Sequence, residues 1–285
     1  MAELLRGAPV ARAVMEGLAP RVAALRERGV TPCLAIVRVG AREDDLAYER
    51  AAEKRCLAAG IAVRRLSLEP ASLDQARLEG ELDALGARDE VHGILLLRPL
   101  PAPLDDAAAV ARIPAGKDVD CAGPAALLAT LSGRGGGFAP CTAESALAIL
   151  DHYGVPLDGA NVTVVGRSLV IGRPASALLL ARNATVTTCH THTRDLAAAC
   201  RAADVVVVAA GSPGALGAGC VRPGQVVVDV GTNWDAAAGR LVGDADFAAV
   251  EPIVSAITPV PGGVGAVTTA ILARHVVEAA ERTCR

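Results

Sequence analysis

Residues 161–174, NVTVVGRSLVIGRP, combine residue types that could hold a phosphate group. Residues 161–165 are typical of a buried parallel strand, and residues 172–182 of a helix. At the turn between them, the missing side chain of Gly166 lets a phosphate approach the backbone, and the helix N-terminus offers unpaired N–H groups. The spacing departs from the usual GxGxxG, so an ordinary strand–helix turn with capping glycines remains an alternative. The pattern predicts a dinucleotide site formed by Gly166, Arg167, Ser168, Gly172 and Pro174.

The residues that follow the next expected strand bear on the kind of dinucleotide. NAD-binding enzymes place Asp or Glu about 20 residues after the glycine turn, to hold the ribose 2′-hydroxyl. Residues 185–193 contain no acid, whereas Arg167, His190, Thr191 and Arg194 are nearby in the sequence. Basic and hydroxyl groups suit a 2′-phosphate, so we expect NADP as the cofactor, with His190 and Thr191 among its contacts.

Helical and strand periodicities alternate along the chain. Strands are expected at residues 33–39, 61–68, 91–97, 161–165, 184–188, 204–208 and 226–230. Helices are expected at residues 10–28, 43–59, 72–85, 172–182 and 194–202, from residue 142 to about 153, and at the C-terminus. Such alternation predicts an α/β protein with parallel sheets. We expect two domains: a three-layer αβ domain of residues 1–141 completed by a helix at 266–285, and a Rossmann-like domain of residues 142–265.

The composition excludes several classes of function. The chain has 285 residues, a mass of 28.8 kDa, a net charge of −3 and a pI near 6.0, with its charges scattered. It therefore gives no electrostatic reason to expect nucleic acid or an anionic membrane as a partner. No apolar run approaches the roughly 20 residues of a membrane helix, and charged residues interrupt the N-terminus, so we expect no secretory signal and a cytoplasmic location.

The eight cysteines form no CxxC pair, and we expect them to be reduced. Cys189, His190 and His192 are close enough in sequence to suggest a metal site. They lack a second cluster of ligands elsewhere in the chain, however. We therefore expect no metal.

Motifs spread over nearly the whole chain resemble those of the bifunctional methylenetetrahydrofolate dehydrogenase/cyclohydrolase family, FolD. The resemblance is carried in the second half by GRSLVIGRP, ATVTTCHTHT, DVGTN, GRLVGDADF and ITPVPGGVG, and in the first half by VHGILL, PLP, KDVD and PCT. Members of that family oxidise 5,10-methylenetetrahydrofolate with NADP, and then hydrolyse the methenyl product to 10-formyltetrahydrofolate. The resemblance implies NADP, a small folate-type substrate, and a homodimer formed through the cofactor domain.

The resemblance also assigns roles to individual residues. Tyr48 matches a tyrosine that packs against the folate, and Asp120 matches an aspartate that binds the pterin. Each has a structural alternative: Tyr48 as a half-buried helix residue, Asp120 as a turn or cap residue. Asp229 and Asn233 suit either a loop beside the nicotinamide or a structural turn. By the same resemblance, further contacts are expected from Pro261, Gly262 and Gly263 to the substrate and from Thr232 to the cofactor.

Two residues that handle protons in the family are missing from this chain. Ala52 occupies the position of a lysine, and Leu97 that of a glutamine which contacts the lysine and also lines the substrate site. Lys54 is a poor substitute, because six residues from Tyr48 it points to another face of the helix. Arg98 is expected on the strand face opposite Leu97. Further departures are Cys121, Ala143, Glu144 and Ala266.

The joint loss of the lysine and the glutamine predicts weak or absent cyclohydrolase activity beside an active dehydrogenase. Two alternatives stay open. One is an oxidoreductase acting on a different, non-folate C–N substrate in specialised metabolism. The other is a catalytically silent paralogue that only binds the nucleotide.

Overall fold

The computed structural model describes residues 1–133, 136–236 and 239–284. The chain divides into two compact units: Met1–Arg12 with Thr142–Thr268, and Ala13–Cys141 with Thr269–Arg285. We refer to them by their main sheets as the six-stranded unit and the three-stranded unit. Residues 1–12, which the sequence analysis grouped with residues 13–141, are thus part of the six-stranded unit. Arg285, at the end of the predicted C-terminal helix, lies outside the described residues.

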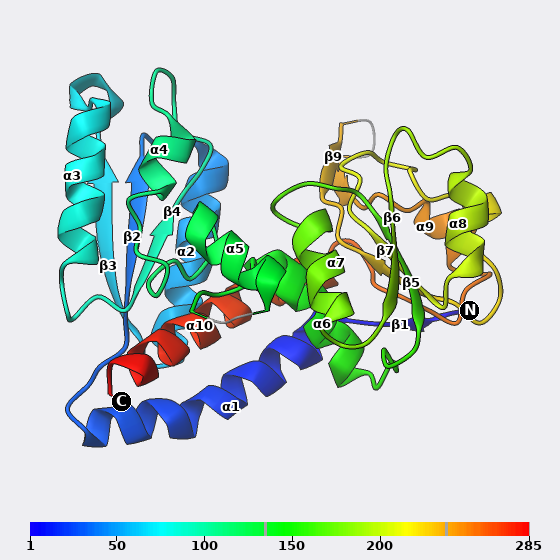
Figure 1. Cartoon of the computed structure of the whole chain (residues 1–285), viewed down its shortest axis with the longest axis horizontal. Coiled ribbons are helices and arrows are strands. Elements are labelled where there is room, and N and C mark those ends of the chain that lie inside the picture. The colour runs from blue at the N-terminus through cyan, green and yellow to red at the C-terminus, as the bar shows by residue number, and fades with distance from the viewer. Residues whose placement is uncertain (134–135, 237–238, 285) are drawn as a thin grey trace. The chain divides into compact units, whose positions relative to one another are not determined.

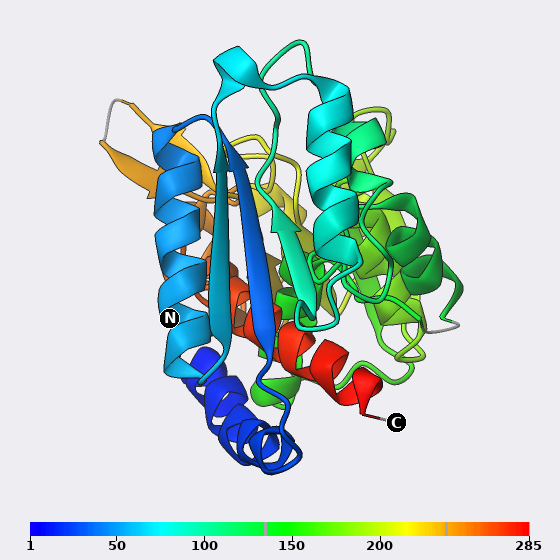
Figure 2. The same ribbon diagram turned by 90° about the vertical axis from the view of Figure 1, so that its left-hand side faces the viewer.

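The three-stranded unit is built on a parallel sheet with the strand order β3-β2-β4. Figure 2 shows α2 and α3 on opposite sides of these strands. The first residues of helices α1 and α10 are assigned to the six-stranded unit. Most residues of both helices belong to the three-stranded unit. The elements are α1 (Gly7–Glu27), β2 (Cys33–Val39), α2 (Glu43–Ala58), β3 (Ala62–Leu68), α3 (Gln75–Gly86), β4 (Gly93–Leu96), α4 (Asp106–Val110), α5 (Pro124–Ser132) and α10 (Thr268–Thr283).

The apolar sequence of β2 explains its central place in this sheet. Its residues are buried except for partly buried Arg38, as expected of a strand covered on both faces. One face contributes Ala35, Val37 and Val39 to a core that also contains Leu78 and Leu82 of α3. The other layer is formed by α2, whose buried residues recur at helical spacing: Asp45, Glu49, Ala52 and Cys56.

The six-stranded unit has a fully parallel main sheet with the order β1-β11-β8-β7-β5-β6. Figure 1 shows α7 on one side of the strands and α8 on the other. A small antiparallel pair, β9 and β10, lies outside this sheet. The elements are β1 (Glu3–Leu4), α6 (Cys141–His152), β5 (Asn161–Val165), α7 (Gly172–Leu180), β6 (Thr185–Cys189), α8 (Leu196–Ala202), β7 (Val205–Val208), β8 (Val226–Asp229), β9 (Asn233–Asp235), β10 (Arg240–Val242), α9 (Phe247–Val250) and β11 (Ala256–Ile257).

The order in which the chain adds strands to this sheet reverses at β5. From β5 the chain passes through α7 to β6 on one side, then returns through α8 to β7 on the other side. Open α/β sheets bind their ligands at the carboxyl ends of the strands where the order reverses. The turn that follows β5, which contains Gly166, therefore occupies the expected binding position.

The strands predicted in the interior of both sheets are present, with ends that shift by one or two residues. The short elements were not predicted, among them α4, α5, α9, β1, β11 and the β9–β10 pair. Each is too short to show a clear period, and β1 consists of only Glu3 and Leu4. Within the described residues, no helix is both long enough and apolar enough to cross a bilayer.

Candidate functional site

The turn after β5 depends on two glycines. Gly166 has φ +133°, and a Cβ there would lie 2.1 Å from the carbonyl oxygen of Ala209, just beyond β7. A Cβ at Gly172 would lie 2.3 Å from the carbonyl oxygen of Gly166. The first glycine therefore gives the turn its shape, and the second lets α7 begin close against it. These are the places where a dinucleotide site needs glycine.

Ser168 organises the start of α7. Its hydroxyl oxygen accepts hydrogen bonds from the backbone N–H groups of Ile171 at 3.1 Å and Gly172 at 3.4 Å. The structural alternative had assigned capping to the glycines and not to Ser168. A hydroxyl that accepts can still donate its own proton to a ligand. Arg167 is exposed beside it, and Pro174 is buried in the first turn of α7, where its missing N–H is harmless.

His190 and Thr191 follow β6, directly beside the glycine turn. The strands pair in register with Val165 opposite Cys189, and the N–H of Gly166 donates to the carbonyl of Cys189 at 2.9 Å. The partly buried ring of His190 accepts the N–H of His192 through Nδ1 at 3.1 Å. The neutral ring therefore carries its proton on Nε2, where it can be donated to a ligand. The turn that contains Arg167 and the residues that follow β6 therefore lie at the same edge of the sheet.

A pocket of about 390 Å³ lies at the end of β8 in the six-stranded unit. Five of the candidate residues line it: Asp229, Thr232, Pro261, Gly262 and Gly263. Gly262 has φ +100°, and its carbonyl accepts the N–H of Gly7 at the start of α1. A Cβ at Gly263 would lie 2.5 Å from the carbonyl oxygen of Pro259, so this position also requires glycine. The proline- and glycine-rich loop is therefore tightly folded against its own unit.

Asp229 and Asp244 hold the loop that carries Thr232. The carboxylate of Asp229, whose residue is 2% exposed, accepts N–H groups of Gly231, Asp244 and Ala245 at 2.9–3.0 Å. Burial raises the pKa of Asp229 to about 6, although these hydrogen bonds act in the opposite direction. Asp244 similarly accepts N–H groups of residues 210–212 and the amide of Asn233. These contacts of Asp229 and Asn233 are those of a structural turn, which was one of the two alternatives for both residues.

Sequence reasoning did not single out Asp244 as part of this loop support. Its signal was available in GRLVGDADF, where the acid lies between two small residues. The close approach of Asp244 to the loop also explains why residue 231 is a glycine, since a Cβ at Gly231 would lie 2.3 Å from the Asp244 carboxyl carbon. Hydrogen bonds from backbone N–H groups to a carboxylate are stronger than hydrogen bonds between neutral groups. An acid that accepts several of them therefore fixes a loop firmly.

A second pocket, of about 460 Å³, lies in the three-stranded unit at the ends of α2 and β4. Tyr48, Leu97 and Asp120, the predicted substrate residues of this unit, all line it. Both Tyr48 and Asp120 are partly buried. Burial raises the pKa of Tyr48 well above its ordinary value, with the charge of Asp120 adding to the effect. The remaining lining residues are Arg42, Asp44, Asp45, Leu95, Leu96, Arg98 and Pro99.

The two acids of KDVD have different roles. Asp118 is 1% exposed, and its carboxylate accepts the N–H groups of Ala122 at 2.9 Å and Gly123 at 2.8 Å. It therefore provides the turn and cap function that was an alternative for Asp120. Burial raises the pKa of Asp120 to about 6, whereas a hydrogen bond with Cys141 lowers it. Asp120 thus presents to the pocket a carboxylate that titrates near neutral pH.

The positions of the missing proton-handling residues are clear. Ala52 is fully buried on the side of α2 that packs against the sheet, and Lys54 is exposed. Leu97 is buried and lines the pocket. Arg98 was expected on the strand face opposite Leu97, and both residues line the same pocket. Strand β4 ends at Leu96, so the alternation of side chains no longer applies beyond it.

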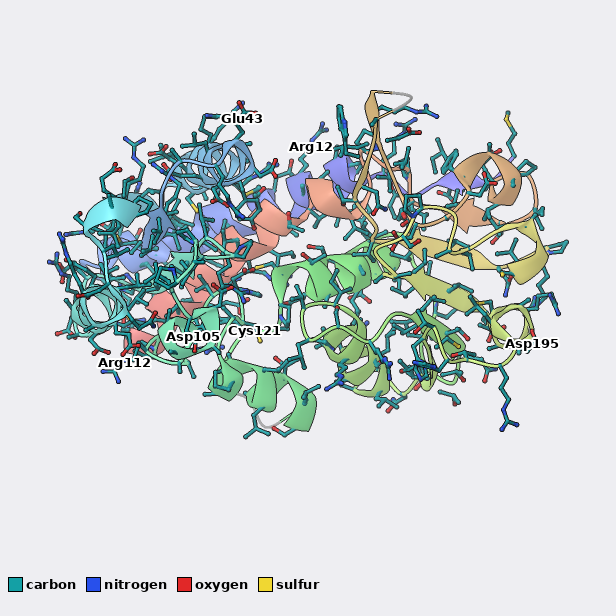
Figure 3. All side chains as sticks on the ribbon, turned by 90° about the horizontal axis from the view of Figure 1, so that it is seen from above. Arg12, Glu43, Asp105, Arg112, Cys121 and Asp195 are labelled. Carbon is teal, nitrogen blue, oxygen red and sulfur yellow. The ribbon has the colours of Figure 1, made fainter. Side chains whose placement is uncertain are left out.

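Cys121 has an unusual backbone conformation, and Arg55 makes a side-chain hydrogen bond. Cys121, which is labelled in Figure 3, lies three residues before α5. Its φ is +55°, a left-handed conformation that favours glycine. Burial raises the pKa of its thiol to about 12, so the thiol stays protonated. Arg55 of α2 is partly buried, and its Nε donates to Thr269 Oγ1 at 3.4 Å.

Family models match both halves of the chain. The model described as tetrahydrofolate dehydrogenase/cyclohydrolase, NAD(P)-binding domain, matches residues 140–284, and that of the catalytic domain matches residues 5–120. The chain belongs to the tetrahydrofolate dehydrogenase/cyclohydrolase family. The bifunctional protein FolD of Carboxydothermus hydrogenoformans is 46% identical over 282 residues, which cover 99% of this chain and 98% of the relative. FolD of a Parafrankia strain is 47% identical over 279 residues, covering 97% and 98%.

Solved structures of this family agree with the fold. The FolD dehydrogenase/cyclohydrolase of Campylobacter jejuni superposes with a TM-score of 0.94 at 35% identity, covering 99% of this chain and all of that one. The FolD of Trypanosoma brucei, solved with NADP and an inhibitor, gives a TM-score of 0.91 at 35% identity, with 100% and 99% covered. The predicted two-domain α/β fold, with a Rossmann-like domain of NAD(P)-binding type, is confirmed.

Proposed function

We propose that this protein is an NADP-dependent 5,10-methylenetetrahydrofolate dehydrogenase of one-carbon metabolism, whose cyclohydrolase activity is weak or lost. Family membership over the whole chain supports the dehydrogenase. The single observation that carries the second part is the fully buried alanine at position 52, combined with an apolar Leu97 in the pocket. Neither side chain can move a proton.

The glycine turn supports a dinucleotide site, because side chains at Gly166 and Gly172 would collide with backbone carbonyl oxygens and break the close approach of β5 to the start of α7. Bound NADP supplies the nicotinamide that accepts a hydride. We assign the pyrophosphate to Gly166, Ser168 and the start of α7, and the 2′-phosphate to Arg167, His190 and Thr191. We propose Thr232 as a cofactor contact, on the loop held by the hydrogen bonds of Asp229 and Asp244. Pro261, Gly262 and Gly263 are the proposed substrate contacts of this unit.

In the three-stranded unit, Tyr48 offers a flat ring for packing against the substrate, and Asp120 a carboxylate for its N–H donors. Oxidation of the methylene carbon transfers a hydride and leaves a methenyl cation, so it requires orientation but no general base. Hydrolysis adds water to that cation, forms the 10-formyl product and releases a proton. That step gains from a residue that can take up the proton, which Ala52 and Leu97 cannot do.

One observation favours a changed substrate as the second candidate. Arg98 brings into the pocket a charge that the family pattern, which has leucine at this position, does not predict. A C–N substrate other than a folate would therefore be the alternative for an active enzyme. A silent nucleotide-binding paralogue would instead bind NADP and turn over no folate.

The proposed assembly and location follow the family resemblance. We propose a homodimer formed through the six-stranded unit, in the cytoplasm, acting on a small molecule rather than on nucleic acid or a membrane. We also retain the proposed functional division into a substrate domain and an NADP-binding domain near residue 141. Size-exclusion chromatography with light scattering tests the dimer directly.

A paired assay on the purified protein tests the activity. One measurement follows the reduction of NADP by 5,10-methylenetetrahydrofolate, and the other follows the decay of methenyltetrahydrofolate above its spontaneous rate. We expect reduction of NADP with little or no accelerated decay. Fast decay would contradict the loss of the cyclohydrolase, and an absence of reduction would contradict the dehydrogenase.

A further inference from the structure

Arg98 differs from the other partly buried arginines of this chain. It makes no hydrogen bond or ion pair with any residue in the described ranges, and it lines the pocket that contains Tyr48 and Asp120. The remaining partly buried arginines have a partner each: Arg21 with Glu281, Arg38 with Glu49, Arg55 with Thr269, Arg222 with the carbonyl of Arg201, and Arg274 with Glu278.

None of the described acids near Arg98 forms an ion pair with it, and this includes Asp44, which lines the same pocket. Asp45 is held by Arg42 through two hydrogen bonds of 2.9 and 2.7 Å. Asp118 is occupied by backbone N–H groups. Asp120 feels the charge of Arg98 but does not form an ion pair with it. Within the described residues, the Arg98 guanidinium therefore has no acid bound to it, and Arg98 lines the pocket.

A guanidinium in this position is selective for certain ligands. Partial burial removes hydration that a protein partner does not replace, so a bound anion would gain the full benefit of pairing. The planar guanidinium also matches a carboxylate with two parallel hydrogen bonds, which an ammonium group cannot provide. It stays charged, so it can bind but cannot act as a proton carrier in place of the missing lysine.

We propose that Arg98 is a specificity-determining residue that binds a carboxylate of the substrate. The inference rests on the proposed function in one respect: in a folate, the carboxylates available are those of the glutamate moiety. The pocket then recognises two ends of a ligand by opposite charges, with Asp120 facing N–H donors and Arg98 facing the carboxylate.

The test uses the full-length protein and needs neither NADP nor turnover. Isothermal titration calorimetry compares p-aminobenzoylglutamate with its uncharged diamide, in wild type, Arg98→Leu and Arg98→Lys. We expect wild type to bind the acid at least about tenfold more tightly, because hydrogen bonds between charged groups are the strong ones. Arg98→Leu should bind both ligands equally, and Arg98→Lys should keep part of the preference. The control is Arg112→Leu, which removes an exposed arginine paired with Asp83 and should behave like wild type.

Several outcomes would overturn the proposal. They are a wild type that binds the two ligands equally or binds neither, and an Arg98→Leu variant that keeps the preference. A clear loss of stability in Arg98→Leu would also overturn it, since this would mean that Arg98 already has a partner within the protein. A free small carboxylate such as benzoate serves as a third ligand. If it binds as tightly as p-aminobenzoylglutamate, the site takes any carboxylate and does not select the substrate.

Failure of the dehydrogenase can be told apart from failure of this inference. If methylenetetrahydrofolate does not reduce NADP but the charge preference is present and depends on Arg98, the substrate is a different carboxylate. If NADP is reduced but the preference is missing, the dehydrogenase stands and the role of Arg98 is wrong.

Discussion

The two units of this molecule build their binding sites in different ways. In the six-stranded unit, the proposed cofactor site depends on the path of the backbone, with glycines at places where a Cβ would lie 2.1–2.5 Å from a carbonyl oxygen. In the three-stranded unit, the pocket is lined mainly by side chains, and these depart from the family pattern at Leu97 and Arg98. Backbone-built sites cannot change one residue without losing their shape. Side chains that line a pocket can be replaced while the fold stays intact.

The largest effect is expected from Gly166→Ala, which tests the backbone-built site. The new Cβ would collide with the carbonyl oxygen of Ala209, at a φ that alanine rarely adopts. We expect NADP binding, measured by calorimetry, to weaken by more than about 100-fold, and the free energy of unfolding to fall by roughly 3 kcal/mol.

Gly217→Ala is the matched control, because a Cβ there meets nothing within 4 Å. It should bind NADP like wild type. If Gly166→Ala also binds NADP normally, the cofactor is not held at this turn, and the comparison between the two units fails.

The second prediction concerns the missing proton-handling residues. In Ala52→Lys with Leu97→Gln, the lysine side chain would extend toward the helix turn that carries Tyr48, since helical side chains lean toward the N-terminus. We expect decay of methenyltetrahydrofolate to accelerate by about 100-fold, the usual scale of general acid–base catalysis. The buried position predicts a loss of roughly 2 kcal/mol in the free energy of unfolding.

Ala51→Lys provides the control for this pair, because it adds the same charge to an exposed site of the same helix. It should not change hydrolysis. No gain in the double variant, while folate still binds, would mean that the pocket geometry itself has diverged from the family.

The third prediction is a pH dependence of folate binding. The pKa of Asp120 is raised to about 6, so the carboxylate is ionised above that pH and takes up a proton below it. A protonated carboxyl accepts fewer N–H donors, so affinity should fall by up to about tenfold per pH unit below pH 6.

Asp120→Asn should bind weakly and show little change between about pH 5 and 7, because its amide does not titrate in this range. Asp44→Asn, an exposed acid of the same pocket, should keep the wild-type profile. A pH profile that is unchanged in Asp120→Asn would remove Asp120 from substrate binding.

The smallest effect is expected at Cys121, whose φ is +55°. Glycine would relieve the left-handed conformation but lose the burial of the thiol, so Cys121→Gly should change the free energy of unfolding by no more than about 1 kcal/mol. Cys121→Val should lower it by about 2 kcal/mol, since a β-branched residue is poorly suited to this conformation. Urea unfolding measures both. Equal stability of the valine variant and wild type would show that this departure from the family pattern carries no strain.

The long helices and strands were predicted from the sequence because each contains enough residues to show its own apolar periodicity. The valine-rich strands β5, β7 and β8 and the helix α2 show clear periods, and the turn with Gly166 lies between two of these elements. Tyr48, Leu97 and Asp120 were predicted from motifs, and they line one pocket. The short elements were missed, because their stability comes from contacts distant in sequence. Glu3 and Leu4, for example, form β1 only by pairing with Ala256 and Ile257.

By itself, the sequence determined the order of strands and helices, the glycine turn, and the absence of a lysine and a glutamine from the family pattern. Only the tertiary structure decided which acids serve the fold: Asp118, Asp229 and Asp244 bind backbone N–H groups, and Asp120 faces a pocket. It also decided that Arg98 lines the same pocket as Tyr48 and has no partner among the residues that the structure describes. The physical reason is that burial and pairing depend on groups brought together from distant parts of the chain, which local periodicity does not record.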